Sequence, residues 1–359
     1  MKNEKKWNVG WGPITSCNMD CQFCYSKHVR KERNELEKKD WIRFINLNHM
    51  YINNINYGTG ENSISDEWFD LVEYIATNYN IQQAVTTNGY ISERVLHDDR
   101  LYQIFTDAIS EIDISLDFAD ETMHNHLRGQ NKAYKWAIKT LELCQKCKIP
   151  TTIVFLGTES VLQPKNLDGL FKIAEQYDAK LRMNIFRPTR GIDEVSKRFI
   201  PSYKRVVTAL KYINDNYKIL AICDPLFNAI LDTGHLCVDP SGSCSIRILG
   251  DGSITPSTYL ISDNFVMGNI KDGKILNKLE IDNIDFNIPR QCESCLYLEQ
   301  CNGGVYDRRY LWYGNFDTSD PYCPFREGNY VPDFKVDIAD NISFSSIHDG
   351  YLPTMFFSN

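Results

Sequence analysis

Three cysteines near the N-terminus have the residue type and the spacing of a metal site. Cys17, Cys21 and Cys24 are separated by offsets of four and three, and they follow an apolar run at residues 7–14. A [4Fe–4S] cluster normally takes four cysteines, so three thiolates leave one iron to be completed by something other than protein. Zinc prefers four ligands, commonly paired cysteines and histidines, and the nearest histidine, His28, lies beyond this stretch. An iron–sulfur site is therefore the favoured interpretation, with zinc or a chance grouping as the alternatives.

The CxxxCxxC pattern, with the aromatic Phe23 before its last cysteine, resembles the cluster loop of radical S-adenosylmethionine (SAM) enzymes. The resemblance implies that these cysteines hold a [4Fe–4S] cluster whose open iron is chelated by SAM. It also implies reductive cleavage of SAM to a 5′-deoxyadenosyl radical, which abstracts a hydrogen atom from the substrate.

A second group of four cysteines lies in the last quarter of the chain. Cys292, Cys295 and Cys301 form a tight run, and Cys323 follows at a distance. Three thiolates on a tight loop with a distant fourth make a full ligand set for a [4Fe–4S] cluster. The same four cysteines would also suit a structural zinc ion.

This region resembles the SPASM domain of radical SAM peptide and protein maturases, which normally binds two auxiliary clusters. Aligned with that pattern, Cys237 and Cys244 take the first two places, whereas Ser257 and Val305 stand where further cysteines are expected. The resemblance therefore implies two [4Fe–4S] clusters in all, one radical SAM cluster and one auxiliary cluster held by the second group. Cys237 and Cys244 are left as free thiols, a bridged pair or ligands completed from elsewhere.

The remaining cysteines are expected to have no metal. Cys144 and Cys147 lie at offset three on a predicted helix, where they share one face and pack as small apolar side chains. Cys223 has no partner at ligand spacing and is interpreted as packing. His124 flanks a turn and is expected to be solvated.

Apolar runs alternate with amphipathic segments over the first two hundred residues, which is typical of a parallel sheet built from βα units. Strands are predicted at 9–15, 50–57, 81–87, 112–116, 151–156 and 181–186, and helices near 30–46, 66–79, 92–108, 132–147, 165–178 and 202–216. Six such units resemble the partial (β/α)6 barrel of radical SAM enzymes. The expected fold class is therefore α/β, with a TIM-like partial barrel followed by a small cysteine-rich domain. The active site of a parallel barrel lies at the C-terminal ends of its strands.

Candidate SAM-binding residues follow the second and third predicted strands. The sequence Thr59-Gly60-Glu61-Asn62 resembles the GGEP motif that holds the SAM amino group, which implies this role for Gly60 and Glu61. Glycine also lets the backbone approach a ligand closely. After the third strand, Asn88 lies in a Thr-Asn-Gly turn that matches a sequence often seen near the SAM site.

Further candidates lie on or just after the fourth and sixth predicted strands. Ser115 and Arg128 match a family segment that contacts the SAM ribose and carboxylate. A hydroxyl can bind a ribose, and a guanidinium can bind a carboxylate. The alternative is a structural ion pair between Asp117 and Arg128. Arg182 and Asn184 alternate to one face of the sixth strand and are candidates for facing SAM and the substrate.

Composition bounds the class of protein. A chain of 359 residues with 43% hydrophobic residues can bury a large core, and its length suggests two domains. The net charge of −8 argues against a nucleic-acid partner. The sequence has no apolar run long enough to span a membrane and no signal peptide, so the 12 cysteines indicate metal ligation in a reducing cytoplasm.

The expected organisation is a radical SAM barrel at 1–200, a helical bridge at 201–235, a SPASM-like domain at 236–330 and a tail at 331–359. The aromatic residues Tyr351, Phe356 and Phe357 indicate that the tail docks on the rest of the protein.

The resemblance implies a radical SAM maturase that modifies a ribosomally synthesised precursor peptide by oxidoreductase or lyase chemistry. Its opening sequence resembles maturases that accompany Nif11-type leader peptides, some of which are spliceases that excise tyramine at a Tyr-Gly site and leave an α-keto-β-amino amide. The implied partners are the peptide, a flavodoxin or ferredoxin as electron donor, and a separate leader-recognition protein. The alternatives are a formylglycine-type sulfatase maturase, a small-molecule radical SAM enzyme and, least favoured, a non-catalytic electron carrier.

Overall fold

The computed structural model describes residues 5–32, 34–279, 286–326, 328–336, 338 and 345–359. The remaining parts of the expected domain ranges (1–4, 33, 280–285, 327, 337 and 339–344) lie outside the described residues. Among the described helices, none is both long enough and apolar enough to cross a bilayer.

A single sheet organises the described chain, with strand order β10-β9-β8-β1-β2-β3-β4-β5-β6-β11-β7. Strands β1 to β6 are parallel neighbours in sequence order. They span Trp7–Trp11, Ile52–Tyr57, Gln82–Thr87, Glu111–Ser115, Thr151–Gly157 and Lys180–Ile185. The six predicted strands are therefore confirmed, each with its limits shifted by at most a few residues.

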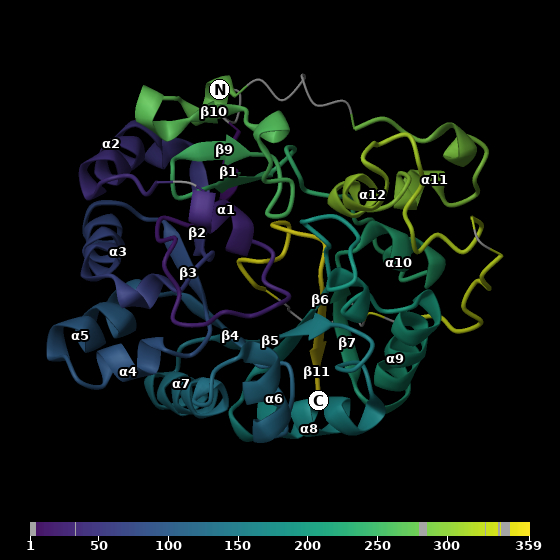
Figure 1. Ribbon diagram of the computed structural model, residues 1–359, viewed down its shortest axis with the longest axis horizontal. Coiled ribbons are helices and arrows are strands. Elements are labelled where there is room, and N and C mark those ends of the chain that lie inside the picture. The colour runs from purple at the N-terminus through teal and green to yellow at the C-terminus, as the bar shows by residue number, and fades with distance from the viewer. Residues whose placement is uncertain (1–4, 33, 280–285, 327, 337, 339–344) are drawn as a thin grey trace.

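Helices cover the outside of this sheet, as Figure 1 shows for α2, α3, α5, α7 and α8. The helices before the bridge are α1 Lys27–Glu32, α2 Lys38–Asn48, α3 Asp66–Asn78, α4 Ile91–Val95, α5 Asp99–Ala108, α6 Glu121–Arg128, α7 Ala133–Cys147 and α8 Pro164–Gln176. Short 3-10 turns lie at His49–Tyr51, Asn62–Ile64, Ser196–Arg198, Asp263–Phe265, Ile270–Asp272, Leu276–Lys278 and Arg290–Cys292. The strands are buried nearly throughout, but several of their buried residues are polar, among them Asn54 and Asn56 of β2 and Glu111 and Asp113 of β4.

Two predicted helices are each divided in the structure. The helix predicted at 92–108 is α4 and α5, because the Asp98 side chain accepts a hydrogen bond from Leu101 N (3.0 Å) and starts a new helix. The helix predicted at 30–46 is α1 and α2. Between them, Leu36 N donates to Gly250 O at 2.9 Å, which ties the connection to a turn far along the chain.

The expected helical bridge is not wholly helical. It contains α9 Tyr203–Asn216, strand β7 Lys218–Ile222 and α10 Pro225–Ile230. Among the described strands, β7 pairs only with β11, Met355–Ser358. The helical prediction for this stretch was wrong because the hydrogen-bonding partner of β7 lies more than a hundred residues away.

Strand β11 lies between β6 and β7 and is antiparallel to both. Tyr351, Phe356 and Phe357 are buried, so the predicted docking of the tail is confirmed. In Figure 1 the yellow C-terminal segment runs through the middle of the molecule beside β6.

The cysteine-rich region extends the same sheet at its other end. Strand β8, Ser245–Ile248, pairs in parallel with β1, and the antiparallel strands β9 Ser253–Thr255 and β10 Gly268–Asn269 follow. The turn between β8 and β9 confirms the predicted hairpin. Helices α11 Leu298–Cys301 and α12 Tyr306–Tyr313 complete the region.

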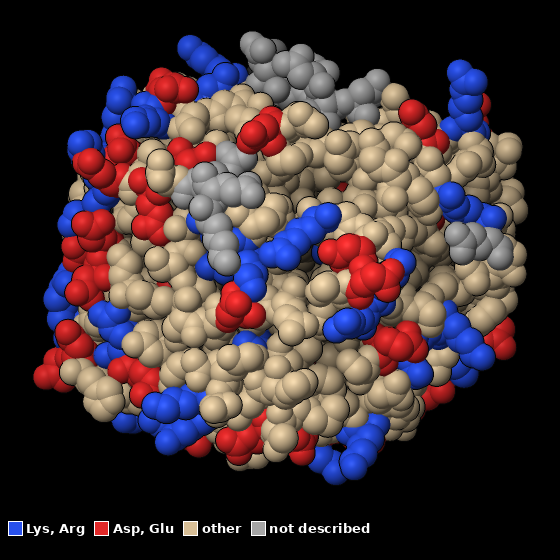
Figure 2. Space-filling view, viewed as in Figure 1, with Lys and Arg blue, Asp and Glu red and all other residues tan. Residues whose placement is uncertain are grey.

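Acidic and basic side chains are interspersed on the face shown in Figure 2, most densely on the left, where Figure 1 places α2, α3 and α5. Ion pairs link these helices: Lys38 and Arg100 both contact Asp70, at 2.7 and 2.6 Å. Exposed pairs of this kind contribute little stability individually.

Candidate functional site

A cavity of about 200 Å³ lies at the C-terminal ends of the parallel strands. It brings together most of the residues that the sequence singled out. The predicted site residues that line it are Cys17, Cys21, Cys24, Gly60, Asn88, Ser115, Arg128, Arg182 and Asn184. This is where a parallel barrel presents its active site.

The three N-terminal cysteines lie on one wall of the cavity. Cys21 Sγ lies 3.4 Å from the carbonyl oxygen of Arg128, and Cys24 Sγ lies 3.6 Å from Ser26 Oγ. Burial raises the pKa of the Cys17 thiol to about 11. A bound metal would have to displace these thiol protons, so metal binding here is coupled to proton release. Three thiols converging on one cavity fit an iron–sulfur cluster with one open coordination position.

The loop after β2 packs directly against the cysteine loop. Thr59 and Gly60 have positive φ angles of 72° and 65°. A Cβ atom at Gly60 would lie 2.5 Å from Ser16 O and 2.6 Å from Ile14 O, and Glu61 N donates to Ser16 O at 2.9 Å. Only glycine fits this approach without moving the backbone that leads to the cysteines.

Glu61, a predicted SAM contact, does not line the cavity. Its buried carboxylate accepts hydrogen bonds from Ser63 Oγ (2.6 Å), Thr87 Oγ1 (3.0 Å) and Asn88 N (2.8 Å). Burial raises the pKa of this carboxyl. Glu61 therefore braces the loops that follow β2 and β3. In turn, the Asn88 side chain donates to Asn18 Oδ1 at 2.8 Å, next to the first cysteine.

The structure shows the ion pair that the sequence left as an alternative role for Arg128. Its Nε and Nη2 atoms lie 2.7 and 2.6 Å from Asp117 Oδ2. Asp117 Oδ1 accepts from Leu156 N at 2.8 Å, so this carboxylate joins β4 to β5. The guanidinium of Arg128 lies 5.0 Å from the centre of the Phe23 ring, beside the cysteine loop. It also lines the cavity.

His124 is buried, so the expectation that it is solvated was wrong. Its Nδ1 accepts a hydrogen bond from Asp117 N at 3.2 Å. Helix α6, which begins at the Asp120 cap, turns this ring inward beside Asp117. Burial lowers the pKa of His124 to about 3. The imidazole is therefore neutral near pH 7.

This burial predicts a pH dependence of stability. The folded-state pKa lies below the unfolded value, so the unfolded chain binds the proton first, and stability is lost as the pH falls from about 6.5 toward 3. At pH 5 the loss from His124 is roughly 2 kcal/mol relative to pH 8. His124→Asn keeps an acceptor for Asp117 N but does not titrate. Urea unfolding at pH 8, 6 and 5 should show the wild type losing stability faster than the variant, and parallel losses would contradict the prediction.

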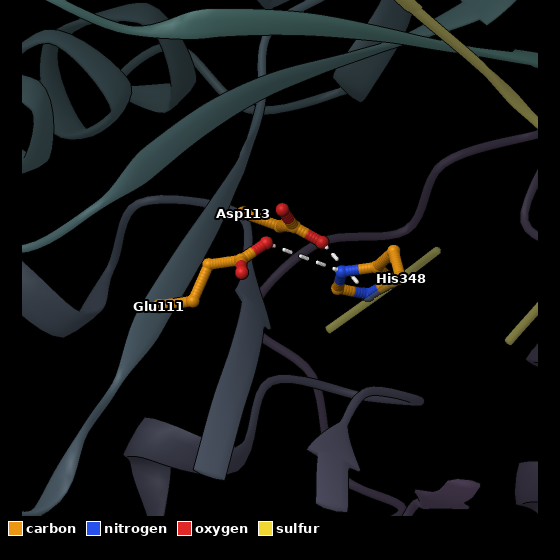
Figure 3. A group of neighbouring side chains, drawn as sticks. All are labelled: Glu111, Asp113 and His348. Carbon is orange, nitrogen blue, oxygen red and sulfur yellow. Dashed lines mark ion pairs between the residues drawn. The ribbon is translucent and has the colours of Figure 1, made fainter. Parts of the chain in front are cut away.

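A buried charge network joins β4, β6 and the C-terminal segment, and Figure 3 shows three of its residues, Glu111, Asp113 and His348. Arg182 pairs with Asp113, and His348 Nε2 lies 2.8 Å from the same carboxylate. Glu111 lies 3.6 Å from His348 Nδ1 and accepts hydrogen bonds from Ser346 Oγ and Ile347 N. The ligand atoms of Glu111, Asp113 and His348 lie within 4.8 Å of one another, close enough for a metal. Arg182 and His348 contact Asp113 Oδ2, and Ser346 and Ile347 donate to Glu111, so we interpret the network as the anchor of the C-terminal segment. Asp113 Oδ1 is buried without a hydrogen-bond partner among the described residues.

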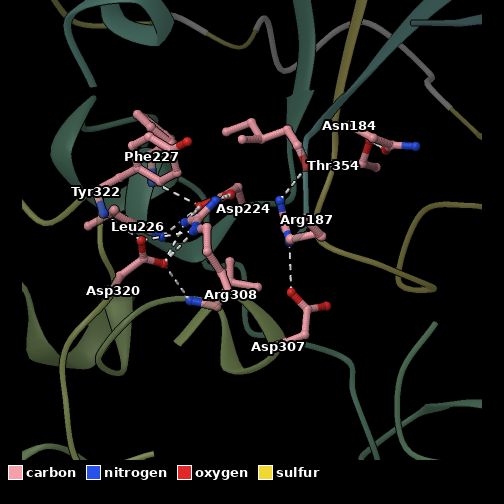
Figure 4. Close-up of polar contacts among 12 residues, drawn as sticks. Asn184, Arg187, Asp224, Leu226, Phe227, Asp307, Arg308, Asp320, Tyr322 and Thr354 are labelled. Atoms are coloured by element: carbon pink, nitrogen blue, oxygen red, sulfur yellow. Dashed lines mark hydrogen bonds and ion pairs between the residues drawn. The ribbon is translucent and has the colours of Figure 1, made fainter. Parts of the chain in front are cut away.

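The four C-terminal cysteines line one pocket, together with Leu226 and Ile230 of α10. The segment that carries Cys323 is held by Asp320, whose carbonyl oxygen accepts from Cys323 N at 2.9 Å. Arg308 pairs with Asp320 and Asp224 at 2.6 Å each, and Arg187 pairs with Asp307 at 2.7 Å (Figure 4). All of these charged groups are buried. The donor set and the pocket fit a four-cysteine metal site.

The two positions at which the SPASM resemblance led us to expect further cysteines have other contacts. Ser257 Oγ donates to Asp307 at 3.1 Å, and Val305 is buried with its N–H donating to Asp320 at 3.0 Å. Cys223 packs with Leu220 and Phe356, as predicted, and the Cys237 thiol lies against this cluster. A hydrogen bond with the Cys237 thiol raises the pKa of Cys223. The sulfur of Cys244 lies 3.4 Å from Gly350 O.

Cys144 and Cys147 lie away from the cavity and from the four-cysteine pocket. Cys144 is fully buried, and Cys147 Sγ lies 3.3 Å from the Tyr102 hydroxyl. This placement agrees with packing.

Sequence reasoning missed several residues that line the cavity. Tyr25, Arg187, Arg247, Tyr259 and Tyr351 all reach it. Arg247 and Tyr351 lie 230 and 334 residues after Cys17, and a local motif search has no signal for them. Alternation along β8 would have placed Arg247 on one face of a strand, but not in this cavity.

The protein has an α/β fold with parallel strands, and three cysteines line the cavity at the C-terminal ends of these strands, where such folds have their active sites. Residues 11–164 match the model of the Radical SAM superfamily, so the chain carries a radical SAM domain. This family implies SAM and a [4Fe–4S] cluster as cofactors.

Curated relatives support the same class. The chain is 24% identical over 329 residues to the mycofactocin maturase MftC of Mycobacterium tuberculosis (strain CDC 1551 / Oshkosh), covering 87% of this chain and 81% of the relative. It is 20% identical over 321 residues to a cysteine-type anaerobic sulfatase-maturating enzyme of Clostridium perfringens (strain ATCC 13124), covering 81% and 86%.

Solved structures share the radical SAM fold. Native anSMEcpe with bound AdoMet and Cp18Cys peptide matches with a TM-score of 0.69 and 18% identity, covering 88% of this chain and 93% of the other. Streptococcus suis SuiB bound to S-adenosylmethionine matches with a TM-score of 0.68 and 16% identity, covering 89% and 77%.

Proposed function

We propose that this protein is a radical SAM maturase that modifies a ribosomally synthesised precursor peptide. The observation that carries the proposal is the convergence of Cys17, Cys21 and Cys24 on the cavity at the strand ends of a radical SAM fold. Its similarity to a mycofactocin maturase, and to structures of enzymes described with bound peptides, favours a peptide substrate.

The residues of the cavity divide into cluster ligands and SAM-binding groups. The three cysteines would hold the cluster, which supplies the electron that cleaves SAM to a 5′-deoxyadenosyl radical. The backbone at Gly60 and the side chains of Ser115 and Asn88 would orient SAM. Glu61 acts indirectly by fixing the Gly60 and Asn88 loops. Asp117 holds the guanidinium of Arg128 in place through Nε and Nη2, and the N–H groups that Asp117 does not bind would be free to donate to SAM.

Arg182 and Asn184 would face the bound molecules from β6. Asp113 fixes Arg182, and Thr354 Oγ1 donates to Asn184 Oδ1 at 2.7 Å. The C-terminal segment therefore shapes the floor of the cavity.

Cys292, Cys295, Cys301 and Cys323 would hold one auxiliary [4Fe–4S] cluster. The alternative for this site is zinc, which also accepts four thiolates. We further propose a flavodoxin or ferredoxin as electron donor, a separate leader-recognition protein and a cytoplasmic location. Full activity of this chain alone on a leader-bearing peptide would count against the separate partner.

For the bond that changes, we propose excision of tyramine at a Tyr-Gly site. The test is anaerobic incubation with SAM, dithionite, candidate partner protein and a leader-bearing peptide containing Tyr-Gly, followed by mass spectrometry. We expect 5′-deoxyadenosine together with a peptide that has lost tyramine. The control peptide carries Phe-Gly, and it should not lose the corresponding unit.

Other outcomes separate the alternatives. Mass shifts without loss of tyramine would retain the maturase and reject the excision. Conversion of a cysteine or serine of a sulfatase peptide to formylglycine would favour the sulfatase maturase, to which the chain is also similar. Absence of any 5′-deoxyadenosine from the cluster-loaded protein would contradict radical SAM catalysis.

A further inference from the structure

Arg247 is a buried cation on the wall of the cavity. It lies on β8, and its side chain is 1% exposed and lines the cavity. Its Nη1 donates to the Tyr351 hydroxyl at 3.2 Å, and its Nη2 donates to Thr59 Oγ1. Its Nε is buried without a hydrogen-bond partner. The guanidinium therefore keeps donor capacity that the surrounding protein does not use.

The other arginines of the cavity all have carboxylate partners. Arg128 pairs with Asp117, Arg182 with Asp113, and Arg187 with Asp307. Within the described parts of the chain, Arg247 forms no ion pair, and its hydrogen-bond acceptors are neutral hydroxyls. A buried charge without a counter-charge is costly, so such a group persists where something else compensates it.

The surrounding residues form a close-fitting support for this guanidinium. Gly10 on β1 leaves room for it, because a Cβ atom there would lie 1.6 Å from the Tyr351 hydroxyl and 2.9 Å from Arg247 Nη1. Tyr351 is held in turn by Thr258 Oγ1 at 2.8 Å. Strands β1 and β8, the β2 loop and the C-terminal segment thus all contribute to its position. A side chain fixed in this way is pre-organised to bind a ligand.

We propose that Arg247 binds a carboxylate of the molecule that occupies the cavity. A guanidinium is the side chain best suited to a carboxylate, which it can bind through two parallel hydrogen bonds. Two ligands could supply this group, namely the carboxylate of SAM and an acidic residue of the peptide. The identity of these two ligands rests on the proposed function, whereas the need of Arg247 for an anion rests on its own surroundings.

A purely structural role makes the opposite prediction for stability. If Arg247 serves the fold, Arg247→Met should lower the melting temperature markedly in the absence of ligand. If Arg247 instead serves to bind an anionic ligand, its buried charge is uncompensated in the ligand-free protein. Replacing it by Met, an apolar side chain of similar length, should then leave the melting temperature unchanged or raise it. A large loss of thermal stability in Arg247→Met would therefore overturn the proposal.

Binding measurements identify the source of the carboxylate. Equilibrium dialysis is carried out anaerobically, without reductant, on cluster-loaded wild type, Arg247→Lys and Arg247→Gln. The first arm compares SAM with decarboxylated SAM. The second arm, in the presence of SAM, compares the capped peptide Ala-Tyr-Gly-Asp-Ala with its Asn counterpart.

In one of these arms, the wild type should bind the acidic ligand about tenfold or more tightly than its neutral counterpart. The ratio should fall below about threefold in Arg247→Gln and be intermediate in Arg247→Lys, because lysine keeps the charge but loses the planar fork. Loss of the ratio in the first arm assigns SAM, and loss in the second assigns the peptide.

Equal ratios in wild type and Arg247→Gln in both arms would overturn the proposal. Because dialysis requires no SAM cleavage, this failure is separate from a failure of the proposed function. A protein that shows an Arg247-dependent ratio but forms no 5′-deoxyadenosine would retain the anion site and reject the catalysis.

Discussion

Replacing Cys17, Cys21 and Cys24 together with alanine should remove about four irons per chain and abolish formation of 5′-deoxyadenosine. These three thiols line one cavity, and no other cysteine is among the described residues of its wall, so none could replace them as a ligand. The wild type should hold about eight irons, because two [4Fe–4S] clusters are proposed. The measurement is iron and sulfide counting after anaerobic reconstitution, followed by assay with SAM and dithionite.

The matched control is the double variant Cys144→Ala/Cys147→Ala. It also removes a closely spaced set of cysteines, but these lie on α7 away from both proposed cluster sites. We expect wild-type iron content and measurable 5′-deoxyadenosine from this control. A triple variant that loses all of its iron would show that the C-terminal cysteines hold zinc or no metal. A triple variant that keeps about eight irons would contradict the assignment of the N-terminal cluster.

The parts of this site that could be predicted from sequence are those encoded locally. Cys17, Cys21 and Cys24 share one loop, Gly60 and Asn88 follow β2 and β3, and Ser115 ends β4, near limits that the sequence indicates. Since parallel strands present their C-terminal ends at one edge, the convergence of these residues follows from the fold class. The structure places all of these residues on the wall of the same cavity.

What could not be predicted depends on contacts between distant segments. Strand β7 is recognisable only beside β11, and Arg247 reaches the cavity only because β8 pairs with β1. The contact between Cys223 and Cys237 joins the bridge to the cysteine-rich region, and Cys223 has no partner at ligand spacing in the sequence. Periodicity describes which face of an element is buried, but not which remote element covers it.

The role of Glu61 shows a different limit. The motif resemblance identified a loop that reaches the cavity at Gly60, but it could not distinguish a residue that contacts a ligand from one that supports neighbouring loops. The deciding observation is that donors from Ser63, Thr87 and Asn88 already surround the carboxylate. A sequence motif shows where a residue lies in the chain. Whether its side chain can still bind a ligand depends on the hydrogen bonds that the side chain already forms in the folded protein.

Arg308→Met should be among the most destabilising single substitutions in the cysteine-rich region. The Arg308 guanidinium is fully buried between Asp224 and Asp320, with which it makes ion pairs at 2.6 Å each. Removing one partner of a buried ion pair typically costs about 3–5 kcal/mol, because the remaining charge is left unpaired. Here two carboxylates lose their counter-charge at once. Urea unfolding at pH 7.5, with the midpoint and slope both recorded, measures the effect.

Arg100→Met is the matched control, because Arg100 also bridges two carboxylates, Asp70 and Glu73, at 2.6 and 2.7 Å. Its side chain is 51% exposed, so water and salt screen the pairs, and the expected cost is about 1 kcal/mol or less. The difference in lost unfolding free energy between the two variants therefore measures how much burial strengthens the contribution of the ion pairs. Equal losses would show that bridging geometry, and not burial, sets the energy.

The consequence of Arg308→Met should extend to the metal site. Asp320 accepts hydrogen bonds from Val305 N and Tyr322 N through its side chain and from Cys323 N through its carbonyl oxygen. Movement of an unpaired Asp320 would displace Cys323, so the variant should bind less iron at the C-terminal site while the N-terminal cysteines keep theirs. Adding Asp224→Asn and Asp320→Asn removes both unpaired charges while retaining acceptors, and should recover much of the lost stability. If these substitutions instead add a further loss, the ion pairs are not the source of the destabilisation, and the packing of Arg308 against Phe227 and Tyr322 takes their place as its cause.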